Sequence, residues 1–416
     1  MNATVPKPGP RPAPRPETEP LFAGLVEAAR ALQPRTVALR RQIHKHPEQG
    51  LTLPATQAAI LHALDGLPLR ISTGTSTSSV VAVLEGARKG PTVLLRGDMD
   101  ALPLTEDTGL AYTSEVPGTM HACGHDTHVA MLASAARLLA TRRDALAGQV
   151  VFMFQPGEEG YHGAKHMIDE GVLDAAGPRA ERALALHITS TLRSGVIQCR
   201  PGPVMASSDV LRVIVRGHGG HGGIPHDAID PVPAAAAMVG ALQTMVARRV
   251  SVHDPAVVTI GHIAAGTTSN IIPEKAFLEG TIRALSEATR TLVHKEIRQV
   301  CEHVAAAHGC TASVEIKLGY PVTVNDAKVG PHVVELSSAV LGQRFAEPMA
   351  DPLMGSEDFS YVTAEVPGAL AFLGACPRGI ELPDAAPNHS AKVLFDEAAM
   401  EHGVVVYAAF ALDALR

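Results

Sequence analysis

Short runs of β-branched residues alternate with longer Ala- and Leu-rich stretches through the first half of the chain. We expect strands at residues 80–84, 92–96, 149–154 and 182–187, with helices at 129–139 and 163–170. Alternation of strands and helices at this spacing predicts an α/β layer fold with a mostly parallel sheet. In such a sheet, functional groups gather at the carboxyl ends of the strands.

Between residues 208 and 319 the pattern changes. Strands are predicted at 210–215, 256–260, 276–282 and 311–317, and helices at 232–249 and 286–308. The order β-α-β-β-α-β is that of a ferredoxin-like α+β unit. We therefore predict two domains, in which residues 208–319 are inserted into a catalytic domain formed by 21–207 and 320–416.

The first twenty residues contain seven prolines and almost no large apolar side chain. Residues 1–20 are expected to form a disordered Pro-rich tail, because a signal peptide would need a continuous apolar core. Helices are then expected from about residue 21 to 31 and from about 35 to 46, and the second should end at Pro47.

Composition narrows the class of protein. A chain of 416 residues is too long for one ordinary core. A net charge of -7 without a basic run argues against nucleic acid as a partner, and no apolar stretch is long enough to span a membrane. The five cysteines are scattered and odd in number, which favours a reducing compartment, the cytoplasm, over a disulfide framework.

The segment from His121 to His128, His-Ala-Cys-Gly-His-Asp-Thr-His, concentrates side chains that coordinate transition metals. We expect it to be a loop that leads into the N-terminus of the next helix. Cys123 and His125 could then point at one centre, because Gly124 gives the backbone room to turn. The alternative is a set of core histidines and a chance cysteine, but packing alone rarely requires so many ligands together.

Carboxylates and an imidazole follow the predicted strands at the same edge. Asp98 and Asp100 follow one strand, and as isolated residues they could equally be helix caps. Glu158 and Glu159 follow the next strand, and His187 ends a third. Two adjacent carboxylates repel each other unless a cation or a shared proton intervenes. One can therefore bind a metal while the other serves as a base toward water.

Five motifs in order resemble the aminoacylase and hippurate hydrolase family, binuclear-metal amidohydrolases that include plant auxin-conjugate hydrolases. The motifs are Arg41-Gln-Ile-His-Lys-His-Pro-Glu48, Arg96-Gly-Asp-Met-Asp-Ala-Leu-Pro103, the segment His121 to His128, the Gln155-Pro-Gly-Glu-Glu-Gly160 turn and Pro387-Asn-His-Ser390. The resemblance runs from about residue 35 to the C-terminus. It implies two divalent ions held by Cys123, His125, Glu159, His187 and His389, with Glu158 as general base.

The resemblance also bears on two aspartates and on the metal. Carboxypeptidases and dipeptidases of the wider clan have a His-x-Asp pair where this chain has Asp98-Met-Asp100. We interpret both aspartates as groups that orient the ligands by hydrogen bonds. A thiolate ligand favours zinc, whereas the oxygen and imidazole ligands also accept manganese, cobalt or nickel.

In the resembling family the insert is a lid that also forms the dimer contact. The loop Gly217-His-Gly-Gly-His-Gly222 has the spacing of a dinucleotide fingerprint, but prolines from Pro225 onward occupy the place of the required helix. The resemblance implies instead that His221 polarises the substrate carbonyl from the neighbouring subunit; a structural role is the alternative. Asn270 and Arg283 are expected to hold the substrate carboxylate.

The function predicted is metal-dependent hydrolysis of N-acyl amino acids to a carboxylic acid and a free amino acid, by a homodimer or homotetramer. A dipeptidase or carboxypeptidase would share the machinery and differ in the acyl pocket. A non-catalytic metal-binding oligomer is the alternative from another class; Glu158 argues against it, because a structural site needs no adjacent base.

Overall fold

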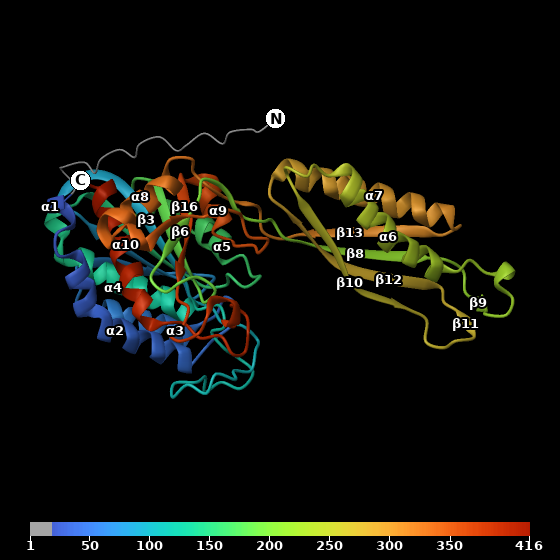
Figure 1. Ribbon diagram of the computed structural model, residues 1–416, viewed down its shortest axis with the longest axis horizontal. Coiled ribbons are helices and arrows are strands. Elements are labelled where there is room, and N and C mark those ends of the chain that lie inside the picture. Colours follow the sequence, from blue (N-terminus) through green and yellow to red (C-terminus); the bar gives the residue numbers. More distant parts are fainter. Residues whose placement is uncertain (1–18) are drawn as a thin grey trace.

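A computed structural model of the protein describes residues 19–416. Most of the predicted Pro-rich tail, residues 1–18, lies outside the described residues. The chain forms a larger α/β body and an elongated insert joined to it by two extended segments (Figure 1). This two-part mixed architecture confirms the predicted fold class.

The larger body is built on an eight-stranded sheet of order β1-β2-β4-β3-β5-β16-β6-β15. At its centre β3 pairs parallel with β4 and β5, and β16 pairs parallel with β5. The carboxyl ends of these strands therefore meet at one edge. The strands are β1 (Leu69–Thr73), β2 (Val80–Glu85), β3 (Arg88–Asp98), β4 (Ala147–Gln155), β5 (Ala180–Thr189), β6 (Ile197–Cys199), β15 (Ala346–Pro348) and β16 (Gly368–Gly374).

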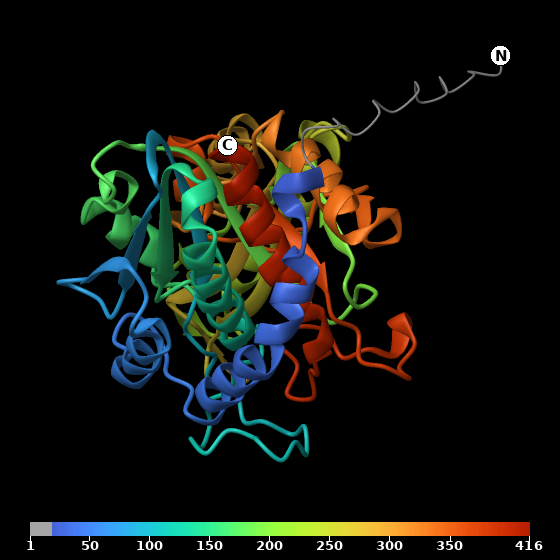
Figure 2. The ribbon, with the colours of Figure 1, turned by 90° about the vertical axis from the view of Figure 1, so that its left-hand side faces the viewer.

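Helices cover both faces of this sheet, because alternate apolar residues of the central strands point to opposite sides. Leu95 of β3 packs into a core with α2, α4 and α10, whereas Leu94 packs into a second core with α5 and α9. Figure 2 shows the first group of helices in front of the sheet. The helices are α1 (Glu19–Phe22), α2 (Leu25–Lys45), α3 (Pro54–Leu64), α4 (His125–Thr141), α5 (Gly163–Asp169), α8 (Val329–Leu341), α9 (Ser360–Glu365) and α10 (Met400–Ala414).

The helix α2 runs without interruption where two helices had been expected. Pro34 lies inside it. A proline in a helix removes one hydrogen bond to the carbonyl four residues earlier, here that of Arg30. Pro34 and Arg30 are both exposed, so water can satisfy that carbonyl. Buried Leu25, Ala29 and Leu39 keep the helix on the core on both sides of the proline.

The insert is a four-stranded antiparallel sheet of order β10-β12-β8-β13 with two helices. Apolar residues of its strands pack against the helices on one face, and no helix of residues 19–416 covers the opposite face (Figure 1). Two short strands, β9 and β11, pair at the end far from the larger body (Figure 1). The elements of the insert are β8 (Asp209–Arg216), β9 (Gly220–His221), α6 (Pro231–Arg249), β10 (Ala256–Ala265), β11 (Ile271–Ile272), β12 (Lys275–Ala284), α7 (Glu287–Ala307) and β13 (Thr311–Leu318). In the larger body, two further short strands, β7 (Gly202–Met205) and β14 (Thr323–Asn325), pair with each other.

The two connections between the parts meet at one buried carboxylate. Asp209, at the start of β8, accepts hydrogen bonds from Arg290 (Nε, 2.9 Å), His294 (Nε2, 2.7 Å) and the amide of Gly319 (3.1 Å). Burial alone would raise the pKa of Asp209, but these partners lower it to about 2. Asp209 is the first residue of β8, and Gly319 directly follows the last residue of β13. We therefore keep 208–319 as the proposed extent of the insert.

Candidate metal centre

Helix α4 begins inside the ligand-rich segment. A loop had been expected up to His128, but the helix starts at His125, with Gly124 before it at φ 87°. A side chain at Gly124 would lie 2.4 Å from Ile188 Cγ2, so glycine is required there for space as well as for its left-handed conformation. The turn places Cys123 before the helix and His125 in its first turn.

All five expected metal ligands meet at this turn, at the carboxyl edge of the sheet. Cys123 Sγ lies 3.4 Å from His187 Nε2 and 3.2 Å from His389 Nε2. Glu159 Oε1 lies 3.5 Å from His389 Nε2 and 3.9 Å from His125 Nε2. These sulfur, nitrogen and oxygen atoms lie within 4.8 Å of one another in groups of three that share members. Such spacing fits side chains that converge on a metal site.

Unpaired buried atoms indicate that the cluster fits divalent ions. Among the described residues, His125 Nε2 and Glu159 Oε1 are buried without a hydrogen-bond partner. Burial raises the pKa of the Cys123 thiol, and burial, with Asp100 and Asp98 nearby, raises the pKa of Glu159 to about 7. A bound divalent cation would supply the missing partner and the positive charge that keep a thiolate and a carboxylate ionised.

Asp98 and Asp100 lie behind the ligands. The Asp100 carboxylate accepts the backbone N–H groups of Glu158 (2.9 Å) and Glu159 (3.0 Å), and its carbonyl lies 2.9 Å from His125 Nδ1. Asp98 contacts His128 Nδ1, and its Oδ2 lies 3.6 Å from His125 Nε2. Asp100 is therefore well placed to orient the ligands. Asp98 is close enough to His125 Nε2 to be a further candidate ligand.

Glu158 is 6% exposed and lies beside the ligand cluster. Its pKa is raised well above the ordinary value, first by burial and then by the nearby carboxylates of Glu357, Glu159 and Asp358. Tyr320, where the chain re-enters the larger body, donates a hydrogen bond to the Glu158 carbonyl. Because burial and the neighbouring carboxylates raise its pKa, the carboxylate of Glu158 binds a proton more tightly than an exposed glutamate does.

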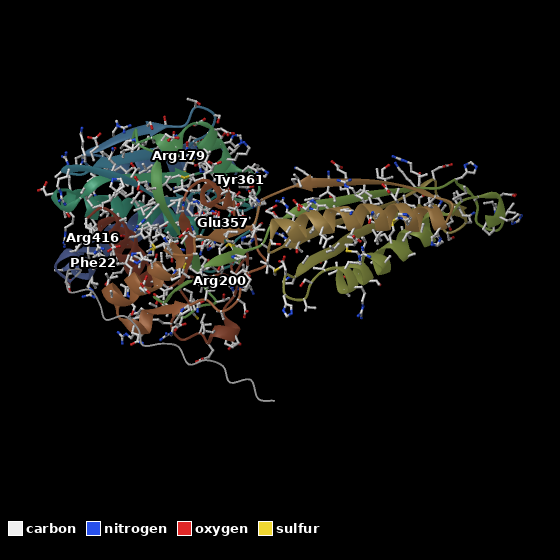
Figure 3. The ribbon with its side chains drawn as sticks, turned by 90° about the horizontal axis from the view of Figure 1, so that it is seen from above. Phe22, Arg179, Arg200, Glu357, Tyr361 and Arg416 are labelled. Carbon is white, nitrogen blue, oxygen red and sulfur yellow. The ribbon has the colours of Figure 1, made fainter. Side chains whose placement is uncertain are left out.

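A buried charge network behind Glu158 was missing from the sequence prediction. Arg96 donates to Asp98 (2.6 Å), Glu357 (2.8 Å) and Asp358 (3.1 Å), and Gln155 donates to Asp358 (2.7 Å). Figure 3 shows Glu357 at the side of the larger body that faces the insert. The motif Met354-Gly-Ser-Glu-Asp-Phe359 was the available signal, since adjacent acids in an apolar setting require a buried cation.

A cavity of about 700 Å³ lies between the metal centre and the near end of the insert. Arg283 lines it and donates a hydrogen bond to Ser356 Oγ at 3.0 Å. His221 and Asn270 do not line it. Both lie at the far end of the insert, on or beside β9 and β11, and both are exposed. Within one chain, then, the structure gathers the five expected metal ligands, Glu158 and Arg283, and leaves His221 and Asn270 apart.

Comparison with known proteins identifies the family. A sequence model of peptidase family M20/M25/M40 matches residues 94–413. The chain belongs to this family. Thermostable carboxypeptidase 1 of Saccharolobus solfataricus is 36% identical over 94% of this chain and 98% of that protein. N-acetylcysteine deacetylase of Bacillus subtilis is 36% identical over 83% of this chain and 90% of that protein.

A solved structure of a dinuclear metal-binding M20 peptidase from Bacillus subtilis superposes with a TM-score of 0.80. Its sequence is 31% identical, over 93% of this chain and 99% of that chain. These relatives confirm the resemblance to metal-dependent amidohydrolases, and the chain is an enzyme of that kind. Within residues 19–416, no helix is long and apolar enough to cross a membrane.

Proposed function

We propose that this protein hydrolyses the amide bond of N-acyl amino acids, with Glu158 as the general base. The observation that carries the proposal is the buried carboxylate of Glu158 next to five converging ligand side chains. The deacetylase relative supports it, since its name states an N-acetyl amino acid as substrate. The scattered cysteines, all free and buried, support the cytoplasm as the compartment.

Two divalent ions would be held by Cys123, His125, Glu159, His187 and His389. Zinc or manganese are the first candidates, and the same side chains also suit cobalt or nickel. When bound, such ions lower the pKa of a water molecule and polarise the scissile carbonyl. Glu158 accepts a proton from the attacking water as the new C–O bond forms. It then delivers that proton to the leaving nitrogen as the C–N bond breaks.

Three residues of the insert are proposed to complete the site. His221 would donate a hydrogen bond to the oxyanion, and Asn270 and Arg283 would hold the α-carboxylate. Because His221 and Asn270 lie far from the metal centre of their own chain, we assign them to the site of a neighbouring subunit. The edge strand β10 is largely exposed from Ile260 to Ala265, which leaves unpaired backbone groups for a homodimer or homotetramer contact.

A dipeptidase or carboxypeptidase remains the second candidate. The carboxypeptidase relative favours it, and its substrates share the free carboxylate that Arg283 would hold. The two functions differ in the group on the acyl side of the scissile bond. A substrate panel therefore separates them better than any variant of the metal centre.

The test is to strip the protein with a chelator, restore zinc, manganese, cobalt or nickel one at a time, and assay a matched panel. The panel contains N-acetyl, N-benzoyl and longer N-acyl amino acids, dipeptides with the same C-terminal residue, and the corresponding amides. We expect metal-dependent release of free amino acid from the N-acyl compounds. Faster cleavage of the dipeptides would favour the second candidate, and no hydrolysis with any metal would refute both.

A further inference from the structure

Charged side chains line the cavity beside the metal centre, and nearly all of them already have a partner or a role. Glu158, Glu159, His187 and His389 belong to the metal centre. Asp209 is held by Arg290 and His294, Glu357 is held by Arg96, and Arg283 is assigned to the α-carboxylate. Two lining side chains remain outside these assignments, Lys317 and His162.

Lys317 lies on the open face of the insert sheet, at its end near the metal centre. It is opposite Val210 in register, and Val210 is opposite Thr281; all three line the cavity. Among the ion pairs of residues 19–416, none involves Lys317. The next cation on that face, Arg212, is paired with Glu279 at 2.9 Å. The ammonium group therefore borders the cavity without a counter-charge.

His162 has an unusual backbone conformation at the same cavity. In the described chain, His162 (φ 58°) and His389 (φ 68°) are the only non-glycine residues with positive φ, and both line the cavity. A side chain in this region is strained and tends to occur where function requires it. The hydroxyl of Tyr320 fixes the turn by accepting the N–H groups of Gly160 (2.8 Å) and His162 (3.4 Å).

The ring of His162 has one nitrogen free for a ligand. Its Nδ1 lies 2.9 Å from the hydroxyl of Tyr361, and Nε2 has no hydrogen-bond partner within residues 19–416. Figure 3 shows Tyr361 near Glu357, on the side of the larger body that faces the insert. Burial and then Lys317 lower the pKa of His162, so the two side chains are close enough to interact.

We propose that Lys317 and His162 form a second anion subsite that selects N-acyl amino acids carrying a second carboxylate. This inference rests on the proposed function. Arg283 on β12 and Lys317 on β13 are separated by β8, which is roughly 10 Å across two strand spacings. Their long side chains can hold both carboxylates of one small molecule. The second carboxylate comes either from the amino acid's side chain or from the acyl group.

Two pairs of substrates distinguish these sources. N-acetylglutamate is compared with N-acetylglutamine, and N-succinyl-leucine with its terminal amide, so that each pair differs in one charge. With metal restored, we expect one acid to exceed its neutral partner in kcat/KM by about tenfold or more, as for a charge-assisted hydrogen bond. The pair that shows the preference identifies the source.

Variants test the residues. Lys317→Met should lower kcat/KM for the preferred acid about tenfold more than for its neutral partner, through KM, and Lys317→Arg should retain the preference. His162→Asn, which tolerates positive φ, should reduce the preference in the same direction. The matched control is Arg212→Met, which removes a cation of the same face outside the cavity lining and should leave the ratio unchanged.

Binding is measured separately, by calorimetry with a Glu158→Gln variant that does not turn over. The preferred acid should bind more tightly than its neutral partner, and adding Lys317→Met should remove the difference. Two outcomes would overturn this inference alone. In the first, the neutral substrates are hydrolysed and the ratio of kcat/KM for the acid to that for its neutral partner is near one in both pairs. In the second, the preference for the acid survives Lys317→Met. Failure to hydrolyse any N-acyl amino acid would overturn the proposed function and this inference with it.

Discussion

The metal centre and the far end of the insert carry two parts of one proposed site, and they are built differently. At the metal centre, His125 and the Glu158 and Glu159 amides are tied to Asp100 by hydrogen bonds of 2.9 to 3.0 Å. At the far end of the insert, the exposed His221 has one hydrogen bond to its ring, from the amide of Gly223 in its own loop.

This contrast follows from what each part must do. Ligands that share cations need fixed positions before the ions bind, because several donor atoms must converge at bonding distance. A side chain that stabilises charge only during the reaction can be brought to the site by a conformational change or supplied by a second subunit. In the proposed site, the metal centre is therefore complete within one chain, whereas the exposed His221 is assigned to the site of a neighbouring subunit.

The largest effect is expected from separating the two adjacent glutamates of the metal centre. Glu158→Gln should keep bound metal and lose turnover by on the order of 100-fold or more, because it removes the proposed general base. Glu159→Ala should lower the bound metal itself. Elemental analysis and kinetics on the two purified variants check this, and a Glu158→Gln protein stripped of metal would show that the roles are wrongly assigned.

The next prediction joins the two parts across subunits. His221→Ala and Glu158→Gln should each be nearly inactive, yet a mixture that exchanges subunits should regain activity. One site of each mixed dimer then has an intact Glu158 and a His221 from its partner. Random pairing makes half the dimers mixed with one good site each, so about a quarter of wild-type activity is the ceiling.

Light scattering on a mixture in which one variant carries a mass tag would first establish that the subunits exchange. No recovery after exchange would place His221 in the site of its own chain or outside the chemistry. Mixing His221→Ala with wild type provides the control for dilution of active subunits.

The contrast between the two parts also explains what could be predicted from the sequence. Cys123 and His125 stand in a short motif that leads into α4, and Glu158 stands in a short motif after β4, so local sequence was enough to single them out. The start of α4 at His125 was missed, because ligand-rich residues suggested a loop while Gly124 alone set the helix start. The single helix α2 was likewise predicted as two helices, because the sequence does not show that Pro34 lies on the exposed side of the helix.

Residues that act through distant contacts were harder to find. Arg96 pairs with Glu357 across 261 positions, and no local pattern announces such a pair. Lys317 and His162 meet at the cavity only because the chain leaves and re-enters the larger body there. The position of His221 relative to a neighbouring subunit likewise depends on how the subunits associate, which local sequence does not encode.

A smaller effect is expected at Arg283, the proposed carboxylate anchor, which belongs to the insert but lines the cavity beside the metal centre. Arg283→Ala should weaken substrates with a free α-carboxylate by about 1.5–3 kcal/mol, the usual value of a hydrogen bond to a charged group. The corresponding amides should be affected much less. Kinetics on matched acid and amide substrates check this, with Arg212→Met as a control, and equal losses would argue against a carboxylate contact.

The smallest effect concerns the joint between the two parts. The pKa of Asp209 is about 2 in the folded protein, below the ordinary value of about 3.9. A carboxylate with a lowered pKa stabilises the fold above its unfolded-state pKa, and this contribution is lost as the pH falls through the folded-state value. The Asp209 contribution should therefore be complete above about pH 4 and should fade between pH 4 and 2.

Replacing the group tests this directly. Asp209→Asn should lower the free energy of unfolding by on the order of 1–3 kcal/mol at pH 7, because Arg290 and His294 lose the negative charge of their shared acceptor. The difference from wild type should shrink as the pH approaches 2. Thermal unfolding followed by circular dichroism suits a chain without Trp, and Asp65→Asn, an exposed carboxylate, serves as the control. A destabilisation of the same size at pH 3 and at pH 7 would mean that Asp209 acts through shape rather than through charge, and that the joint is not held by this ion cluster.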